Sequence, residues 1–381
     1  MVPLRNLALA SVLFCITSAV PTLGSFTHRG VDSTQPSVVL DNATVIGFTN
    51  ETTGTIQYLG IPFAQPPVGD LRLRLPQPVA PYAGTIDATT FGNQCFQLPG
   101  SATNLTVPQD EDCLNVNVIV PANLTAGSGK LPVVVWIYGG GFTGGSNTAE
   151  PVQNVVARSV ELGHPIVAVS ANYRLSAFGF LGGKEMKEAG VTNLGLHDQR
   201  ETFRWVQKYI SAFGGDPTQV TIWGESAGAI SVAAHMLHND GDTEGLFRAA
   251  FMQSGAPVPT GDVDNALCQS TFDQIVSGTG CAGSDDPIAC LRNVSVDVFF
   301  EALNTSAAQS TYFTNSPWLP RADGAFLAQP PQRQLLAGKI ADVPFVSGND
   351  LDEGTLFSFT TLNVTTDDEF LGYVIRKNLL R

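Results

Sequence analysis

Charged side chains are scarce in this sequence. Asp, Glu, Lys and Arg make up 14% of its 381 residues, whereas an ordinary globular domain has about 25%. The 34 acidic residues outnumber the 20 basic ones and give a formal net charge of −14. The basic residues are scattered, so the sequence offers no basic face to neutralise phosphates. We therefore do not expect nucleic acid as a partner.

Long apolar runs and metal-binding patterns are also missing. The apolar stretch at residues 7–20 is too short to span a bilayer, and no later stretch approaches that length. The six cysteines show neither a Cys-x-x-Cys motif nor a Cys/His spacing typical of zinc sites. We expect no stable membrane insertion, no metal and no cofactor.

Residues 1–24 have the layout of a secretory signal peptide. Arg5 is the only charged residue in this segment, and Pro21 and Gly24 follow the apolar stretch. Cleavage after Ala19 and cleavage after Gly24 both fit the pattern. We therefore expect secretion; a membrane-anchored N-terminus is the alternative.

A Gly-Glu-Ser-Ala-Gly motif at residues 224–228 predicts a nucleophilic serine, Ser226. Residues 220–223 are β-branched or aromatic and predict a strand, while the small residues 227–234 predict a helix. A sharp strand-to-helix turn that exposes a serine is a nucleophile elbow, and its glycines allow the strand and the helix to approach. An ordinary strand-to-helix turn is the alternative, because the motif alone is weak.

Three consecutive glycines at residues 139–141 follow the apolar segment 131–137, which predicts a strand buried on both faces. Glycines leave backbone N–H groups unobstructed, and such donors can bind the oxyanion of a tetrahedral intermediate. A flexible loop is the alternative for the glycines alone. Together with the serine turn, they predict an oxyanion hole.

Short strands alternate with helical stretches along most of the chain. This pattern predicts an α/β fold with a mostly parallel central sheet, helices on both faces, and an antiparallel hairpin start in residues 37–48 and 55–59. No repeat, low-complexity linker or charge block divides the sequence, so we expect one domain over residues 25–381. The expected later strands are residues 115–120, 133–137, 166–170, 220–223, 249–253 and 343–347.

Eight ordered blocks resemble the type-B carboxylesterase family, the group of cholinesterases and fungal lipases on the α/β-hydrolase fold. The resemblance runs from about Val38 to about Phe370. It implies a serine hydrolase that cleaves carboxylic esters through an acyl-enzyme on Ser226. The blocks are residues 60–69 (G-I-P-F-A and P-P-V-G), 111–115 (E-D-C-L-N), 138–142 (Y-G-G-G-F), 172–174 (N-Y-R), 195–200 (G-L-H-D-Q-R), 213–217 (F-G-G-D-P), 224–228 (G-E-S-A-G) and 252–255 (M-Q-S-G).

The resemblance also implies roles for individual residues. Gly140, Gly141 and the backbone N–H of Ala227 match the oxyanion hole. Glu353, after the strand expected at 343–347, matches the acid of the catalytic triad. On chemistry alone Asp350 or Asp352 could serve as well, because a carboxylate that orients an imidazole depends on position more than identity.

The sequence holds no histidine in the place that the resemblance implies. The resemblance places the triad histidine, which acts as the base, roughly a hundred residues beyond the acid. Only 28 residues follow Glu353. His235 is nine residues after Ser226 on the expected helix, roughly 13 Å away at about 1.5 Å per residue, too far to take its proton. We interpret all five histidines as surface or structural residues: His28, His164, His197, His235 and His238.

We expect the sequence to be part of a longer enzyme, truncated before the triad histidine. A fold without its last strands and helices would expose a sheet edge and apolar surface. The other explanation for the absent histidine is that the protein has lost its catalytic base. Either way we expect little ester turnover from this form, and the alternative function is a non-catalytic, cholinesterase-like binding or adhesion module.

Cysteines and glycosylation signals fit a secreted protein. Cys268 has no partner in the implied pairing. It is a buried free thiol, pairs with a cysteine outside the sequence, or forms a competing disulfide with Cys281. Seven N-x-S/T sequons could carry sugar that supplies surface polarity. The resemblance implies the disulfides Cys95–Cys113 and Cys281–Cys290, and the sequons are at Asn42, Asn50, Asn104, Asn123, Asn293, Asn304 and Asn363.

The loop between Cys95 and Cys113 has 17 residues and is the counterpart of the lid in lipase-like relatives. It is short for a flap over a long acyl tunnel, so we expect an esterase or lipase that prefers modest acyl chains. The resemblance also implies a structural ion pair between Arg72 and Glu111 at the base of this loop. The natural ester and the oligomeric state stay open.

Overall fold

The structure is a computed structural model that describes residues 35–97, 106–122, 129–306, 316–358, 361–362 and 364–376. Several predicted features lie outside the described residues: the signal peptide, His28, residues 98–105 of the loop between Cys95 and Cys113, and the sequons Asn104, Asn123 and Asn363.

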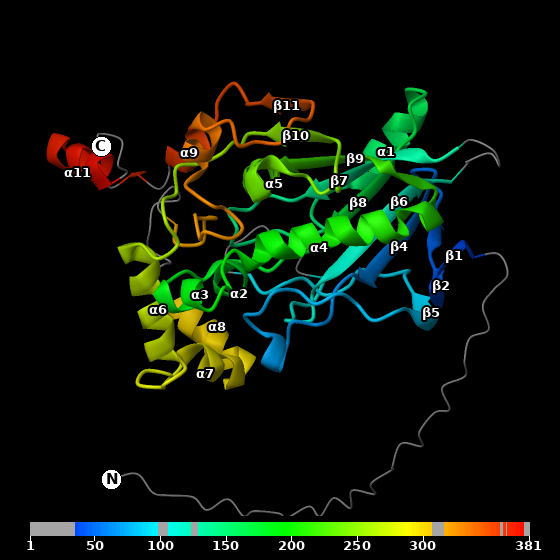
Figure 1. The fold of residues 1–381 in the computed structure, drawn as a ribbon. Helices are drawn as coiled ribbons and strands as arrows, with labels where there is room; N and C mark the ends of the chain where they lie inside the picture. Colours follow the sequence, from blue (N-terminus) through cyan, green and yellow to red (C-terminus); the bar gives the residue numbers. More distant parts are fainter. Residues whose placement is uncertain are drawn as a thin grey trace, which may run out of the picture. The chain divides into compact units, whose positions relative to one another are not determined.

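In the described part of the chain, the central element is a mixed sheet of eight strands in the order β11-β10-β9-β7-β8-β6-β4-β3 (Figure 1). Neighbouring strands from β11 to β8 pair parallel, and β6, β4 and β3 continue the sheet with antiparallel pairs. The predicted α/β fold class is confirmed. The strands are β3 (Phe48–Asn50), β4 (Thr55–Pro62), β6 (Asn115–Pro121), β7 (Leu131–Ile137), β8 (Val167–Ala171), β9 (Gly215–Glu225), β10 (Ala249–Gln253) and β11 (Phe345–Gly348).

Helices follow most of the parallel strands. The longest described one, α4, begins after the strand expected at 166–170 and carries the G-L-H-D-Q-R block. The α-helices are α1 (Val152–Glu161), α2 (Ser176–Phe180), α3 (Lys184–Glu188), α4 (Leu194–Tyr209), α5 (Ala227–Leu237), α6 (Ala266–Gly278), α7 (Pro287–Asn293), α8 (Val296–Thr305), α9 (Pro331–Leu336), α10 (Thr355–Ser358) and α11 (Asp367–Arg376). Short 3₁₀ turns lie at Gly69–Leu71, Ile210–Phe213 and His238–Gly241.

The two faces of the sheet pack against different helices, because successive side chains of a strand point to opposite faces. In β7, Val133, Val135 and Ile137 belong to the large core that also holds the buried residues of α4 and α5. Trp136 belongs instead to a smaller core that it shares with Val152 and others on α1. Helices therefore cover both faces, as Figure 1 also shows.

The N-terminal hairpin lies in a sheet of its own, which the sequence did not predict. Strands β1 (Ser37–Leu40) and β2 (Asn42–Ile46) pair antiparallel, and β2 also pairs with β5 (Ala83–Asp87). At Gly47 the chain passes from β2 to β3 of the main sheet. An added Cβ at this glycine would lie 2.5 Å from the carbonyl oxygen of Gln57, so the two sheets approach here backbone to backbone. Strand β5 is mostly exposed, which explains why it lacks an apolar pattern.

A buried ion pair joins the end of β8 to α4. Arg174 donates to both carboxylate oxygens of Asp198, at 2.8 and 2.7 Å, and its backbone N–H donates to the same carboxylate. The side chains are 3% and 0% exposed. Arg174 also donates to the carbonyl of Arg74, so this pair holds three distant segments together.

No helix in the described ranges is long and apolar enough to cross a membrane.

We predict that Asp198→Asn lowers the free energy of unfolding by about 3–5 kcal/mol, because it leaves the buried guanidinium of Arg174 without its countercharge. Urea unfolding measures this change. The matched control is Glu161→Gln, which breaks an exposed ion pair with Arg158 and is expected to cost less than about 1 kcal/mol. Equal effects of the two substitutions would contradict the prediction.

Candidate active site

Ser226 lies in a sharp turn between β9 and α5. Its backbone has φ 53° and ψ −120°, a conformation that non-glycine residues seldom adopt and that costs free energy. Two backbone hydrogen bonds hold it there: its N–H donates to Gln253 at 2.9 Å, and its carbonyl accepts from Ile230 at 2.9 Å. The turn therefore has the geometry of a nucleophile elbow.

Glycines make this turn possible because the backbones around it leave no room for side chains. A Cβ at Gly228 would lie 2.0 Å from the carbonyl oxygen of Ile137, and one at Gly224 would lie 2.4 Å from the carbonyl carbon of Gly228. A Cβ at Gly139 would lie 3.0 Å from the Cβ of Ser226. The helix, the elbow and the three-glycine loop thus meet at one point.

Three backbone N–H groups around this point donate no hydrogen bond to any described residue: those of Gly140, Gly141 and Ala227. The carbonyl of Gly140 accepts from the N–H groups of Thr143 and Gly144, both at 3.1 Å. Every described peptide bond is trans, so the N–H of Gly141 points away from that carbonyl. The N–H of Ala227 belongs to the first turn of α5, where such groups have no intrahelical partner and the helix dipole is positive. This arrangement can bind an oxyanion.

A reciprocal tyrosine pair anchors the start of the glycine loop. The rings of Tyr138 and Tyr173 stack at 4.4 Å, and each hydroxyl donates to the other residue's carbonyl, at 3.1 and 3.0 Å. Burial raises the pKa of both hydroxyls, so both stay protonated donors. This role was not predicted from the sequence, where the available signals were the position of Tyr138 beside the glycines and of Tyr173 in the N-Y-R block.

Glu353 lies in an exposed loop after β11, and its Oε1 accepts a hydrogen bond from the N–H of Asp350 at 2.8 Å. Strands β9, β10 and β11 are parallel neighbours, so this loop follows the same sheet edge as Ser226. Asp352 is engaged elsewhere, because its carboxylate accepts from the N–H and hydroxyl of Thr355 at the start of α10. No hydrogen bond between described atoms joins Ser226 to Glu353.

Carboxylates gather around the elbow. Burial raises the pKa of Glu225, and the negative charges of Glu150, Glu353 and Asp350 raise it further. Glu225 directly precedes Ser226, and its Oε2 lies 2.5 Å from where a Cβ of Gly139 would be. Several carboxylates therefore place negative charge beside the elbow.

The four described histidines make no hydrogen bond to Ser226. His164 is exposed. His235 is buried on α5, where its Nε2 is 2.9 Å from Oε1 of Gln199, and Nδ1 of His238 is 2.9 Å from the carbonyl oxygen of Phe326. The ring of His197 also packs edge-on against Phe326. The contacts of His235 and His238 lie at the end of α5 that is remote from the elbow.

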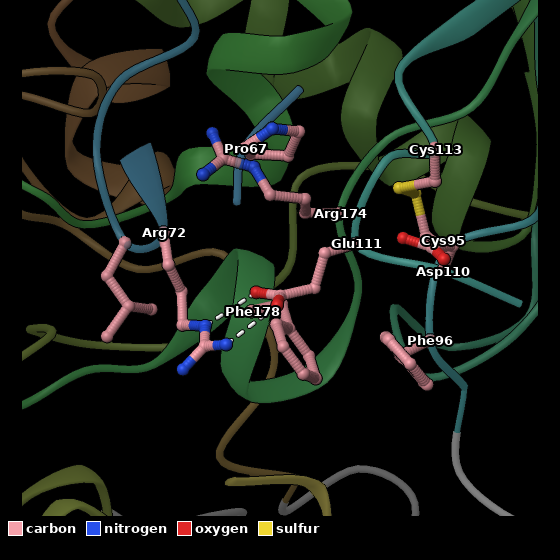
Figure 2. A pocket seen from close by; sticks show the side chains of 10 residues that line it. Pro67, Arg72, Cys95, Phe96, Asp110, Glu111, Cys113, Arg174 and Phe178 are labelled. Carbon is pink, nitrogen blue, oxygen red and sulfur yellow. Dashed lines mark hydrogen bonds and ion pairs between the residues drawn. A yellow bond between two sulfur atoms is a disulfide. The ribbon is translucent and has the colours of Figure 1, made fainter. Parts of the chain in front are cut away.

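Two disulfides, Cys95–Cys113 and Cys281–Cys290, are present, and Cys268 is a buried free thiol whose pKa burial raises. Figure 2 shows the first disulfide beside the ion pair of Arg72 and Glu111. The cavity between them has a volume of about 10 Å³, enough for roughly one water molecule. It cannot hold an ester substrate.

Arg72 and Glu111 form a buried, two-fold hydrogen-bonded pair, with distances of 2.5 and 2.7 Å. Arg72 also donates to the carbonyls of Leu291 and Val294, at 3.0 and 2.7 Å. The pair therefore ties the base of the loop between Cys95 and Cys113 to α7.

A larger cavity of about 180 Å³ lies near the start of α1 and does not include Ser226.

Four sequons are described. Asn42 and Asn293 are exposed, while Asn50 and Asn304 are half-buried. The carboxamide oxygen of Asn304 is buried without a partner among the described atoms.

The histidine environment predicts a pH-dependent stability. Burial lowers the pKa of His197 to about 4, whereas an unfolded histidine titrates near pH 6.5. Between these values the unfolded state binds more protons, so the contribution of His197 is intact above pH 6.5 and is lost as the pH falls towards 4, by about 1.4 kcal/mol per pH unit. We predict that His197→Gln flattens the pH dependence of urea unfolding between pH 7.5 and 5. His164→Gln is the exposed control, and a wild-type slope in both variants would refute the prediction.

Known proteins resemble this chain over most of its length. A family model described as the carboxylesterase family matches residues 34–380. Lipase 2 of Diutina rugosa is 40% identical over 362 residues, which cover 89% of this chain and 66% of that protein. Secreted lipase 1 of Botryotinia fuckeliana is 41% identical over 355 residues, 87% of this chain and 61% of that protein. The chain thus spans slightly under two thirds of the length of these curated relatives.

Solved structures give the same result. Aspergillus niger EstA matches with a TM-score of 0.74 and 32% identity, over 89% of this chain and 67% of that one. A thermophilic PNB esterase matches with a TM-score of 0.77 and 32% identity, over 88% and 68%. The chain belongs to the carboxylesterase family, which the blocks in its sequence resemble.

Proposed function

We propose that this chain carries the nucleophile, the oxyanion-binding groups and the acid of a secreted carboxylic-ester hydrolase. The observation that carries the proposal is the strained turn at Ser226, next to three backbone N–H groups without partners among the described residues. Acyl transfer uses an accessible serine nucleophile and unpaired donors for the oxyanion, together with a base.

In the proposed reaction, the Oγ of Ser226 attacks the carbonyl carbon of the ester. The N–H groups of Gly140, Gly141 and Ala227 bind the oxyanion of the tetrahedral intermediate. Collapse of the intermediate breaks the bond to the alkoxy group, which leaves as the alcohol with the proton that Ser226 lost. The remaining acyl-enzyme is then hydrolysed by water to the carboxylic acid and free Ser226.

The proton of Ser226 has to pass to a base, and in triad chemistry the acid orients a histidine for this step. Glu353 is the proposed acid, because it follows β11 at the position that matches the acid of the family. No described histidine lies in a position to serve as the base. We therefore propose that the 381 residues alone turn over esters slowly, through the oxyanion-binding groups.

The proposed substrates are neutral carboxylic esters with modest acyl chains. The names of the relatives point to ester substrates, since they are lipases and esterases, and two of the lipases are named as secreted. The short loop between Cys95 and Cys113 supports the limit on chain length, although residues 98–105 of it are outside the described part.

We predict that a fluorophosphonate probe labels Ser226 in the protein as its host produces it, because the probe reacts with serines that an adjacent base activates. Mass spectrometry of the peptides locates the adduct. Ser226→Ala, made in the same form, is expected to remain unlabelled. A folded protein without any adduct would favour the non-catalytic binding module instead.

We predict that Glu353→Gln lowers kcat by about 10³- to 10⁴-fold in the form that reacts with the probe, because the neutral amide no longer orients and stabilises the charged imidazole. Hydrolysis of a p-nitrophenyl ester measures this. Asp352→Asn is the matched control and is expected to change kcat by less than about threefold. If Asp352→Asn has the larger effect, the acid is assigned wrongly.

A further inference from the structure

Gln97 is a buried glutamine whose side chain binds the backbone of the glycine loop. It is 2% exposed, its Oε1 accepts from the N–H of Gly145 at 2.9 Å, and its Nε2 donates to the carbonyl of Gly145 at 2.7 Å. These two hydrogen bonds have the same pattern as those between two residues that pair in an antiparallel sheet. The carboxamide thus takes the place of a neighbouring strand at Gly145.

The backbone of Gln97 is itself held in place. Cys95, two residues earlier, is bonded to Cys113, and the N–H of Gln97 donates to the side chain of Gln109 at 3.1 Å. Its Nε2 also lies 3.2 Å from Oε1 of Gln94. Because the disulfide at Cys95 and these hydrogen bonds already hold Gln97, less conformational entropy is lost when its side chain binds Gly145.

Gly145 in turn contacts the peptide unit that contains the N–H of Gly140. A Cβ at Gly145 would lie 2.6 Å from the carbonyl oxygen of Gly139 and 2.5 Å from Cδ2 of Tyr138. In a trans peptide the carbonyl of Gly139 and the N–H of Gly140 point in opposite directions. A displacement of Gly145 therefore changes the direction of the Gly140 N–H.

We infer that Gln97 is a positioning residue for the oxyanion hole and couples the loop closed by Cys95 and Cys113 to that hole. Glycines have no strong conformational preference of their own, so the direction of their N–H groups depends on outside anchors. Tyr173 anchors one end of the glycine loop at Tyr138, and Gln97 anchors the other at Gly145. The inference rests on the proposed function, because it assigns the hole a role in ester hydrolysis.

The test is Gln97→Leu in the form of the protein that hydrolyses esters. Loss of an anchor acts on transition-state binding, so kcat is expected to fall about 10- to 100-fold while KM changes less than about threefold. Affinity for an alkyl trifluoromethyl ketone, which forms an oxyanion when Ser226 adds to it, is expected to fall by a similar factor. Gln97→Glu keeps an acceptor for the N–H of Gly145 but places a carboxylate oxygen against the carbonyl of Gly145, so it is expected to lose activity as well.

The matched control is Gln207→Leu. The carboxamide of Gln207 also bridges two backbone groups, the carbonyls of Pro217 and Leu246 at 2.8 and 3.0 Å, but it lies at the far end of α4. This variant is expected to lose stability without a change in kcat. Similar losses of kcat and ketone affinity in both glutamine variants would reduce Gln97 to a purely structural residue and overturn the inference.

Two further outcomes are decisive. An unchanged kcat in folded Gln97→Leu would overturn the inference even if Ser226 is the nucleophile, whereas full activity of Ser226→Ala would refute the proposed function itself. If neither Gln97 variant folds, hydrogen exchange in the unaltered protein tests whether Gln97 anchors Gly145. Slow exchange at the N–H of Gly145 supports the anchor, and exchange as fast as in an exposed loop rules it out.

Discussion

The site depends on a contact between two backbones, where Gly228 of α5 lies against the carbonyl of Ile137 at the end of β7. A Cβ there would lie 2.0 Å from the carbonyl oxygen, so only glycine permits the helix to begin so close to the sheet. This approach brings the N–H of Ala227 and the positive end of α5 to the three-glycine loop. It also leaves Ser226 in a strained conformation that hydrogen bonds with the end of β10 and with α5 hold in place.

Much of this arrangement could be predicted from the sequence, because it depends on local patterns. Apolar runs indicate the strands, and glycines mark the turns at Ser226 and after β7. The reciprocal bonds of Tyr138 with Tyr173 and the bond of Gln97 with Gly145 could not be predicted in this way. They join residues 35 and 48 positions apart and leave no periodic signal. The exposed strand β5 was missed for a related reason, since it has no apolar alternation.

Around the elbow, the buried paired side chains and the carboxylates lie in different places. The stacked tyrosines anchor the glycine loop, and the ion pair of Arg174 with Asp198 next to Tyr173 keeps buried polar groups paired. The carboxylates of Glu225 and Glu353 lie at the edge of the sheet where β9 and β11 end. Negative charge at this edge repels anions, including the carboxylate that the proposed reaction releases.

The central claim is that Ser226 and three backbone N–H groups form one oxyanion-binding site. A crystal structure of the protein with a trifluoromethyl ketone bound tests it most directly. The account predicts a covalent bond from Oγ of Ser226, with the ketone oxygen about 2.7–3.1 Å from the nitrogens of Gly140, Gly141 and Ala227. A covalent adduct whose oxygen faces solvent, or a ketone bound elsewhere, would contradict the account.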